Sequence, residues 1–228
     1  MSTIADNIDQ VSSRIRAATQ AAGRAENSVR LLAVSKTKPA QDLRDAHAAG
    51  LCDFGENYLQ EALGKQLELA DLPLIWHFIG PIQSNKTRAI AEHFAWVHSV
   101  DRLKIAQRLS EQRPAELPPL NICIQVNVSG EASKSGCTPA DLPALAEAIS
   151  TLPRLKLRGL MAIPEPTQDR AEQDAAFAAV QRLQDSLNLP LDTLSMGMSH
   201  DLESAIANGA TWVRIGTALF GARDYSQS

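Results

Sequence analysis

The chain has 228 residues, with 22 Lys or Arg against 26 Asp or Glu, so its formal net charge is −4 at pH 7. These scattered charges argue against a nucleic-acid-binding protein that relies on a basic face, and the hydrophobic fraction of 44% is ordinary for a globular domain. No run approaches the roughly 18 apolar residues of a membrane helix, and residues 1–6 show no secretory signal pattern. We therefore expect a cytoplasmic protein with neither a membrane nor a nucleic acid as its partner.

A predicted helix opens the chain, and repeated strand–helix units follow it. Ile4, Ile8, Val11 and Ile15 recur at spacings of three and four, which is typical of an amphipathic helix, and Gly23 is placed to end it. Short apolar runs predict strands at residues 31–34, 52–54, 74–79, 96–100, 122–128, 157–161, 193–196 and 211–215. Helical periodicity predicts helices at residues 40–49, 57–70, 84–92, 101–112, 139–150, 168–187 and 201–208.

This alternation predicts an α/β fold with a single (β/α)8 TIM barrel. Near-continuous apolar strands indicate parallel strands buried on both faces, and a doubly wound sheet would usually have fewer of them. Residues 216–228 leave little room for a full eighth helix, so we expect the N-terminal helix to cover that part of the barrel wall. Gly50 and Gly209 are placed to terminate two of the helices. No Pro/Gly-rich segment divides the chain, so residues 1–228 are expected to form one domain.

Cysteine and histidine positions point away from disulfides and metals. Cys52, Cys123 and Cys137 are odd in number and form no C-x-x-C pair, so neither a disulfide framework nor a zinc site is indicated. His77 and His98 lie in apolar runs, which favours hydrogen-bonded barrel residues over metal ligands. We expect no metal site, and the sequence contains no P-loop, no G-x-G-x-x-G fingerprint and no G-x-S-x-G elbow.

A lysine directly follows the first predicted strand, at the end of the barrel where active sites form. The amine of Lys36 would be a Schiff-base nucleophile if burial or a nearby positive charge lowered its pKa. A lysine at a strand end can equally extend to solvent, and spacing alone favours that outcome. This position by itself is therefore a weak indication of chemistry.

The last two strand–helix units suggest a phosphate site. Ser199 precedes a helix that begins near Asp201, and we expect it to be the N-cap of that helix. Gly216 and Thr217 follow the eighth strand. Loops after strands seven and eight often bind phosphate in such barrels, because helix N-termini present backbone N–H groups. A phosphorylated ligand opposite a Schiff-base lysine suggests pyridoxal phosphate, although a phosphosugar would also fit.

In combination, these segments resemble the pyridoxal phosphate homeostasis proteins of the YggS/PROSC type. The resemblance is carried by residues 32–38, 54–58, 76–80, 83–86, 158–161, 194–199, 213–216 and 220–221. It implies a barrel like the N-terminal domain of alanine racemase, with pyridoxal phosphate held as an internal aldimine. Matched motif by motif, the cofactor-binding residues would be Lys36, Asn57, Ser199, Arg214, Gly216 and Thr217.

Within that match, Lys36 carries the aldimine, Arg214 approaches the pyridine nitrogen and Asn57 lies near the ring, while the other three hold the phosphate. An arginine beside that nitrogen disfavours a protonated pyridinium and so weakens the cofactor as an electron sink. A racemase also needs an acid/base on each face of the substrate α-carbon. Alanine racemases have a second, β-rich domain that supplies one of them, whereas this sequence ends at Ser228, soon after the eighth strand, so we expect no such domain. Neither of the two tyrosines of this sequence is placed to act as the second acid/base.

We therefore expect a non-enzymatic, monomeric protein of vitamin B6 homeostasis that stores, buffers or delivers pyridoxal phosphate, with apo-enzymes as candidate recipients. One alternative is a pyridoxal phosphate-dependent racemase or lyase of limited activity. Another is a phosphosugar enzyme that uses Lys36 without a cofactor. The sequence also leaves open whether Lys38, Lys86 or Lys134 contacts a second cofactor molecule.

Overall fold

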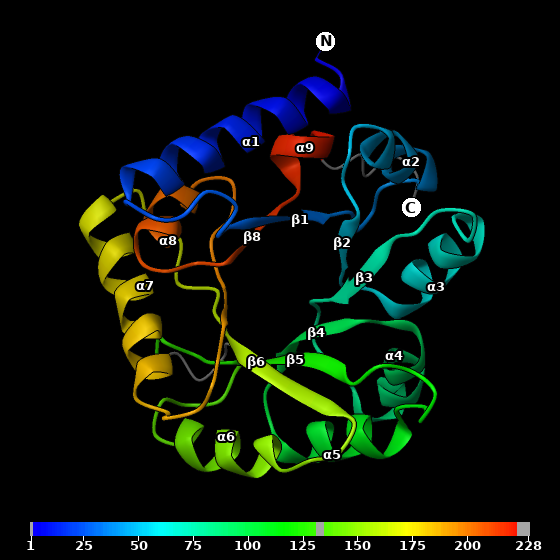
Figure 1. The fold of residues 1–228 in the computed structure, drawn as a ribbon, viewed down its shortest axis with the longest axis vertical. Helices are drawn as coiled ribbons and strands as arrows, with labels where there is room; N and C mark the ends of the chain where they lie inside the picture. Colours follow the sequence, from blue (N-terminus) through cyan, green and yellow to red (C-terminus); the bar gives the residue numbers. More distant parts are fainter. Residues whose placement is uncertain (1, 131–134, 223–228) are drawn as a thin grey trace.

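The computed structural model describes residues 2–130 and 135–222, and a closed barrel of parallel strands forms its centre (Figure 1). Each strand pairs with the next along the chain, and the last pairs with the first. The strands are β1 (Arg30–Val34), β2 (Asp53–Glu56), β3 (Ile75–Phe78), β4 (Trp96–Val100), β5 (Leu120–Gln125), β6 (Leu155–Met161), β7 (Thr193–Ser195) and β8 (Trp212–Ile215). The predicted (β/α)8 barrel is confirmed.

Helices between the strands form the outer layer. They are α1 (Ile4–Ala21), α2 (Ala40–Ala48), α3 (Leu59–Glu68), η1 (Ser84–Lys86), α4 (Thr87–His93), α5 (Leu103–Gln112), α6 (Leu142–Ser150), α7 (Arg170–Asp185), α8 (Leu202–Ala207) and α9 (Thr217–Phe220). The predicted helix at 84–92 begins as a 3-10 turn, η1, before α4. In the part of the chain that the structure describes, none of the helices is long and apolar enough to span a membrane.

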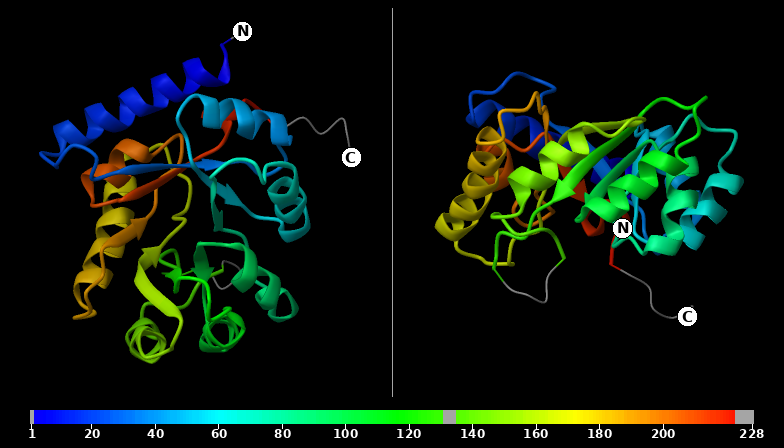
Figure 2. Two further views of the ribbon diagram at one scale, coloured as in Figure 1. Left: turned by 45° about the vertical axis from the view of Figure 1, so that its right-hand side comes forward. Right: turned by 90° about the horizontal axis from the view of Figure 1, so that it is seen from below.

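The N-terminal helix closes the outer layer, as predicted. The helix after β8, α9, has only four residues, and α1 lies across the outside of β1 and β8 beside α8 and α9 (Figures 1 and 2). Ile8, Val11 and Ile15 are its buried apolar residues, spaced to face the barrel wall. Gly50 and Gly209 follow the ends of α2 and α8 with φ of +100° and +97°, which confirms both as helix terminators.

Because side chains alternate along each strand, one set packs against the helices and the other set points into the barrel. Outward side chains such as Phe54, Ile124 and Val213 join the apolar core beneath the helices. Inside the barrel, Trp96 belongs to a small separate cluster, and the imidazole of His77 stacks on it with ring centroids 5.5 Å apart and an interplanar angle of 8°. The inside of the barrel is therefore aromatic and polar, where barrels of this class usually hold branched aliphatic residues.

Two neutral histidines lie in this interior. The side chains of His77 and His98 are fully buried, and His77 Nδ1 lies 2.9 Å from His98 Nε2, so the prediction of hydrogen-bonded barrel residues is confirmed. Burial lowers the pKa of His77. Burial, followed by the nearby His77 and Arg214, holds the pKa of His98 well below its usual range. Both rings are thus uncharged at neutral pH.

We predict that these two imidazoles make the protein less stable in mild acid. Because their pKa values are lowered on folding, the unfolded chain binds more protons as the pH falls below about 6.5. The free energy of unfolding therefore rises with pH, and each histidine contributes a slope of up to about 1.4 kcal/mol per pH unit below about pH 6.5. Urea unfolding at about pH 7.5 and about pH 5.5 measures this slope.

Two variants separate this effect from general acid destabilisation. His98→Gln is expected to lose one histidine's share of the slope. His93→Gln, which changes an exposed residue at the end of α4, is expected to keep the full slope. Equal slopes in the wild type and both variants would contradict the assignment of a neutral, buried His98.

Candidate functional site at the barrel mouth

The residues expected at the site gather where the strands end, which we call the barrel mouth. Val34 of β1 pairs with Gly55 of β2, so Lys36 and Asn57, each two residues further along, both lie just beyond the carboxyl ends of adjacent strands. Gly216 lies against β1, since a Cβ on it would be 3.2 Å from the carbonyl oxygen of Val34. Neighbouring strands β8, β1 and β2 therefore bring the loops that carry these residues together.

Lys36 lies on a backbone segment held by hydrogen bonds on both sides. Its neighbour Ser35 turns outward, where its hydroxyl donates to Glu56 Oε1 at 2.6 Å. The carbonyl of Ser35 accepts from Lys65 Nζ at 2.7 Å, and the N–H of Thr37 donates to Glu61 Oε1 at 2.5 Å. Lys36 itself begins a tight turn directly after β1, which the N–H of Lys38 closes by donating to the carbonyl of Ser35 at 3.1 Å and in which Thr37 has a φ of +63°.

The group that holds this segment, the clamp cluster, consists of Ser35, Glu56, Glu61 and Lys65. Lys65 reaches from α3 and donates to Glu56 Oε1 at 2.7 Å and to Glu61 Oε1 at 2.6 Å. Burial raises the pKa of Glu56, and the charge and hydrogen bond of Lys65 act in the opposite direction. The motifs in the sequence do not indicate this role of Lys65; the only signal is a glutamate four residues before a lysine on a predicted helix.

Arg214 supplies a buried positive charge within β8. Its side chain donates to two neutral oxygens, the Ser195 hydroxyl at 2.9 Å and the Ala162 carbonyl at 3.1 Å. Burial lowers the pKa of Arg214 to about 10, so the guanidinium stays charged at neutral pH. A buried cation with neutral partners is suited to a ligand atom that accepts a hydrogen bond.

The two helix starts after β7 and β8 face this region with backbone N–H groups. The expectation that Ser199 is the N-cap of α8 is wrong, because Asp201 occupies that position. The Asp201 carboxylate accepts instead from the backbone N–H of Met198 at 2.6 Å, so the N-cap lies two residues later than predicted. Ser199 lies half-buried in this loop, and its carbonyl accepts from Arg14 of α1 at 3.0 Å. Neither α8 nor α9 has a side-chain cap, which leaves N–H groups at both starts for an anion.

Asn57 provides further evidence that the mouth is built for a ligand. Among the residues that the structure describes, its side-chain Oδ1 is one of the few buried polar atoms without a hydrogen-bond partner. Gly80 allows this position, because a Cβ on residue 80 would lie 2.3 Å from the carbonyl oxygen of Asn57. A buried, unpartnered amide oxygen is costly unless something binds to it.

The other lysines near the mouth have different surroundings. Lys38 donates to the carbonyls of Phe220, Gly221 and Ala222 at 3.0, 3.1 and 2.9 Å, so it ties its loop to the end of α9. Lys86 ends η1 and is half-buried. Lys134 lies outside the described residues.

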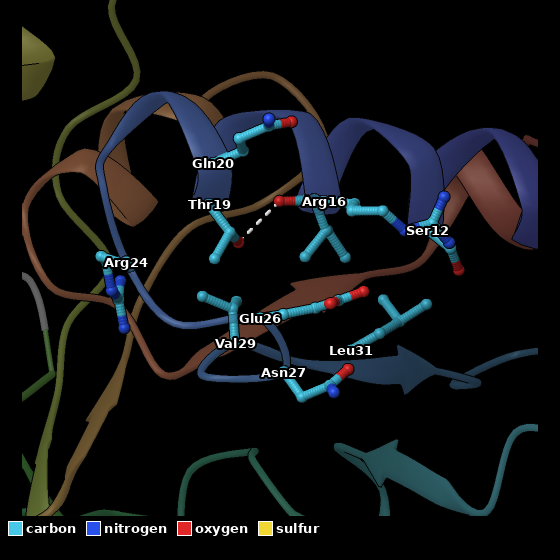
Figure 3. Close-up of a pocket in the computed structure, with 10 residues that line it drawn as sticks. Ser12, Arg16, Thr19, Gln20, Arg24, Glu26, Asn27, Val29 and Leu31 are labelled. Atoms are coloured by element: carbon cyan, nitrogen blue, oxygen red, sulfur yellow. Dashed lines mark hydrogen bonds between the residues drawn. The ribbon is translucent and has the colours of Figure 1, made fainter.

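A cavity of about 530 Å³ lies elsewhere, between α1 and the start of β1 (Figure 3). Arg16, Thr19 and Gln20 of α1 line it together with Val29 and Leu31, and the side chain of Thr19 points toward Val29. It is on the outside of the barrel wall and does not include the residues of the mouth. Across residues 2–130 and 135–222, no group of three or more His, Cys, Asp or Glu is arranged to hold a metal ion.

Comparison with known proteins shows the family to which this chain belongs. The family model of the alanine racemase N-terminal domain matches residues 7–224. A pyridoxal phosphate homeostasis protein of Pseudomonas aeruginosa is 79% identical over 99% of this chain and 98% of its own length. The chain belongs to the pyridoxal phosphate homeostasis proteins. The relative from Escherichia coli K12 in this family is 53% identical over the full length of both chains.

Solved structures agree with this family assignment. PipY of Synechococcus elongatus, solved with pyridoxal phosphate bound, is 42% identical and superposes with a TM-score of 0.85, covering 96% of this chain and all of that one. Alanine racemase from Corynebacterium glutamicum is 18% identical with a TM-score of 0.67, covering 96% of this chain and 63% of that one. The second likeness shows the shared barrel fold alone.

We predict that the clamp cluster is a major source of stability at the mouth. Lys65→Met leaves the buried Glu56 carboxylate without its cation, and breaking such a pair costs about 3–5 kcal/mol. Urea unfolding measures the loss. Lys104→Met, at an exposed position of α5, is the control and is expected to change stability by less than about 0.5 kcal/mol.

A double variant tests the cause. Lys65→Met combined with Glu56→Gln is expected to be more stable than Lys65→Met alone, because a neutral amide replaces the unpaired carboxylate. If Lys65→Met were no more destabilising than Lys104→Met, the clamp cluster would not hold the Lys36 segment.

Proposed function

We propose that this protein binds pyridoxal 5′-phosphate through Lys36 and serves vitamin B6 homeostasis by holding the cofactor rather than by turning over a substrate. The proposal rests on the placement of Lys36, in the turn that follows β1 at the mouth, on a segment held by the clamp cluster. The pyridoxal phosphate homeostasis proteins that match over their full length and the pyridoxal phosphate-bound PipY structure support the choice of ligand.

The residues of the mouth fit the parts of this cofactor. When bound, pyridoxal phosphate supplies an aldehyde with which a lysine amine condenses, releasing one water. Lys36 would provide that amine, since the hydrogen bonds to Ser35 and Thr37 limit how far its backbone can move. Ser199, Gly216 and Thr217 would hold the phosphate together with the uncapped N–H groups of α8 and α9.

Arg214 and Asn57 would bind the ring. A guanidinium carries only donors, so Arg214 would donate to the pyridine nitrogen and keep it unprotonated. The buried Oδ1 of Asn57 lacks a partner within the described part of the chain, and a polar group of the ligand would satisfy it.

The arrangement supports retention of the cofactor better than catalysis. Racemisation requires proton transfer on both faces of an α-carbon, and Lys36 could serve one face. Tyr58, the tyrosine in the described ranges, is 53% exposed at the start of α3. Tyr225 lies outside the described residues.

The proposal extends to the setting in which the protein works. We propose that residues 1–228 act as one monomeric domain in the cytoplasm and pass the cofactor to apo-enzymes. The three cysteines, Cys52, Cys123 and Cys137, are free thiols, which suits a reducing compartment.

We predict that borohydride reduction of the protein loaded with pyridoxal phosphate attaches a pyridoxyl group to Lys36. Peptide mapping by mass spectrometry locates the adduct. Lys36→Ala is expected to lose the adduct and the visible absorbance band while keeping its melting temperature, because a side chain at the mouth contributes little to the core. Lys86→Ala, a half-buried lysine near the mouth, is expected to keep both. An adduct on another lysine with Lys36 unmodified would overturn the assignment.

We predict no amino-acid racemisation by the loaded protein above the rate of free pyridoxal phosphate. Incubating alanine and other L-amino acids with it, followed by chiral chromatography, measures this. Turnover in the usual enzymatic range, about 1 per second or faster, would favour the alternative of a pyridoxal phosphate-dependent racemase.

A further inference from the structure

A chain of hydrogen bonds crosses the inside of the barrel behind Arg214. The Arg214 guanidinium donates to Ser195 Oγ at 2.9 Å, and Ser195 Oγ lies 2.7 Å from His98 Nδ1. His98 Nε2 lies 2.9 Å from His77 Nδ1, and His77 Nε2 lies 2.9 Å from Asp53 Oδ1. Asp53 begins β2, so the chain connects the mouth with the amino end of the barrel.

Both ends of this chain force one direction on it. A guanidinium can only donate hydrogen bonds, and a carboxylate can only accept them. Between them, burial keeps His77 and His98 neutral, so each ring has one donor and one acceptor nitrogen. The Ser195 hydroxyl must therefore donate to His98 Nδ1, and both imidazoles must carry their proton on Nε2.

Aromatic packing keeps the two rings in place. His77 stacks on Trp96 and meets the edge of Trp212, with ring centroids 5.5 and 5.0 Å apart. Arg30 lies over Trp212 with its guanidinium carbon 4.2 Å from the ring centroid, and it donates to Asp53 Oδ2 at 3.1 Å. The carboxylate of Asp53 is thus held between Arg30 and His77.

We infer that Asp53, His77, His98 and Ser195 form a one-directional relay that positions the Arg214 guanidinium, and that the Asp53 carboxylate sets its direction. Because every donor points toward Asp53, the lone pairs of Ser195 Oγ stay available to Arg214, and each bond polarises the next. Arg214 keeps a fixed orientation, with its remaining N–H groups available to the mouth. The direction of the relay depends only on residues of this protein, whereas its effect on the cofactor rests on the proposed function.

Asp53→Asn is expected to reverse the relay. Arg30 would attract the amide oxygen of the new side chain, which turns the amide NH2 toward His77 Nε2. His77 would then carry its proton on Nδ1 and donate to His98, and His98 would donate to Ser195. The Ser195 hydroxyl would receive hydrogen bonds from both sides and lose its present acceptor.

The structure offers a matched control at the same end of the barrel. Asp192 precedes β7 and accepts from Arg158 at 2.8 and 2.9 Å, and Arg158 lies over Trp96 with its guanidinium carbon 4.6 Å from the ring centroid. This arrangement repeats that of Asp53, Arg30 and Trp212 without a histidine beyond the carboxylate. Asp192→Asn therefore removes a carboxylate paired with an arginine at the same end of the barrel, at a more exposed position than Asp53, without touching the relay.

Nitrogen-15 NMR of the histidine rings tests the direction in the protein without cofactor. Signals are assigned with single His→Gln variants. The wild type and Asp192→Asn are expected to show His77 and His98 as neutral Nε2–H tautomers, and Asp53→Asn is expected to show both as Nδ1–H. A charged ring or an Nδ1–H tautomer at either position in the wild type would overturn the relay. Unchanged tautomers in folded Asp53→Asn would overturn the role of Asp53.

Loading with pyridoxal phosphate tests the positioning of Arg214. Asp53→Asn and Ser195→Ala are expected to shift the visible absorption maximum and to weaken binding about tenfold, whereas Asp192→Asn leaves both unchanged. If the wild type shows the expected tautomers but the absorption spectrum is unshifted in both Asp53→Asn and Ser195→Ala, the relay does not position Arg214. A wild type that takes up no pyridoxal phosphate would refute the proposed function and leave the tautomer result standing.

Discussion

Closure of the parallel barrel is the constraint on which the rest of this structure depends. Once β8 pairs with β1, every strand has two neighbours, and alternate side chains must point either to the helices or into the barrel. The outward set forms the apolar core, which provides the hydrophobic stabilisation. The inward set is free to be polar and aromatic only because hydrogen bonds satisfy it from within the barrel.

Two charged groups near the mouth are stabilised in different ways. Lys65 is paired with carboxylates on the outer side of β2, where it holds the backbone beside Lys36. Arg214 is inside the barrel with neutral partners, so its charge remains available to a ligand. This difference explains how one small region can combine a backbone segment held by hydrogen bonds with a buried cation whose hydrogen-bond acceptors are neutral.

The fold could be read from the sequence because each strand is a short apolar run between polar turns. The bounds of β4 agree with the prediction. Strand β5 begins two residues before the predicted strand at 122–128 and ends at Gln125, the last residue that pairs with β6. The Ser199 prediction failed because a serine before a helix and an aspartate two residues later are both good N-caps. Only the loop geometry chooses between them.

The sequence by itself determined the barrel, the replacement of an eighth helix by α1, and the position of Lys36 directly after a strand. Local periodicity carries that information, because neighbours along a strand or helix are close in the sequence. Only the tertiary structure decided that Lys65 holds the Lys36 segment and that Ser195 connects Arg214 to His98. Hydrogen bonds act over about 3 Å and depend on direction, and barrel closure makes partners of residues that spacing along the chain does not relate.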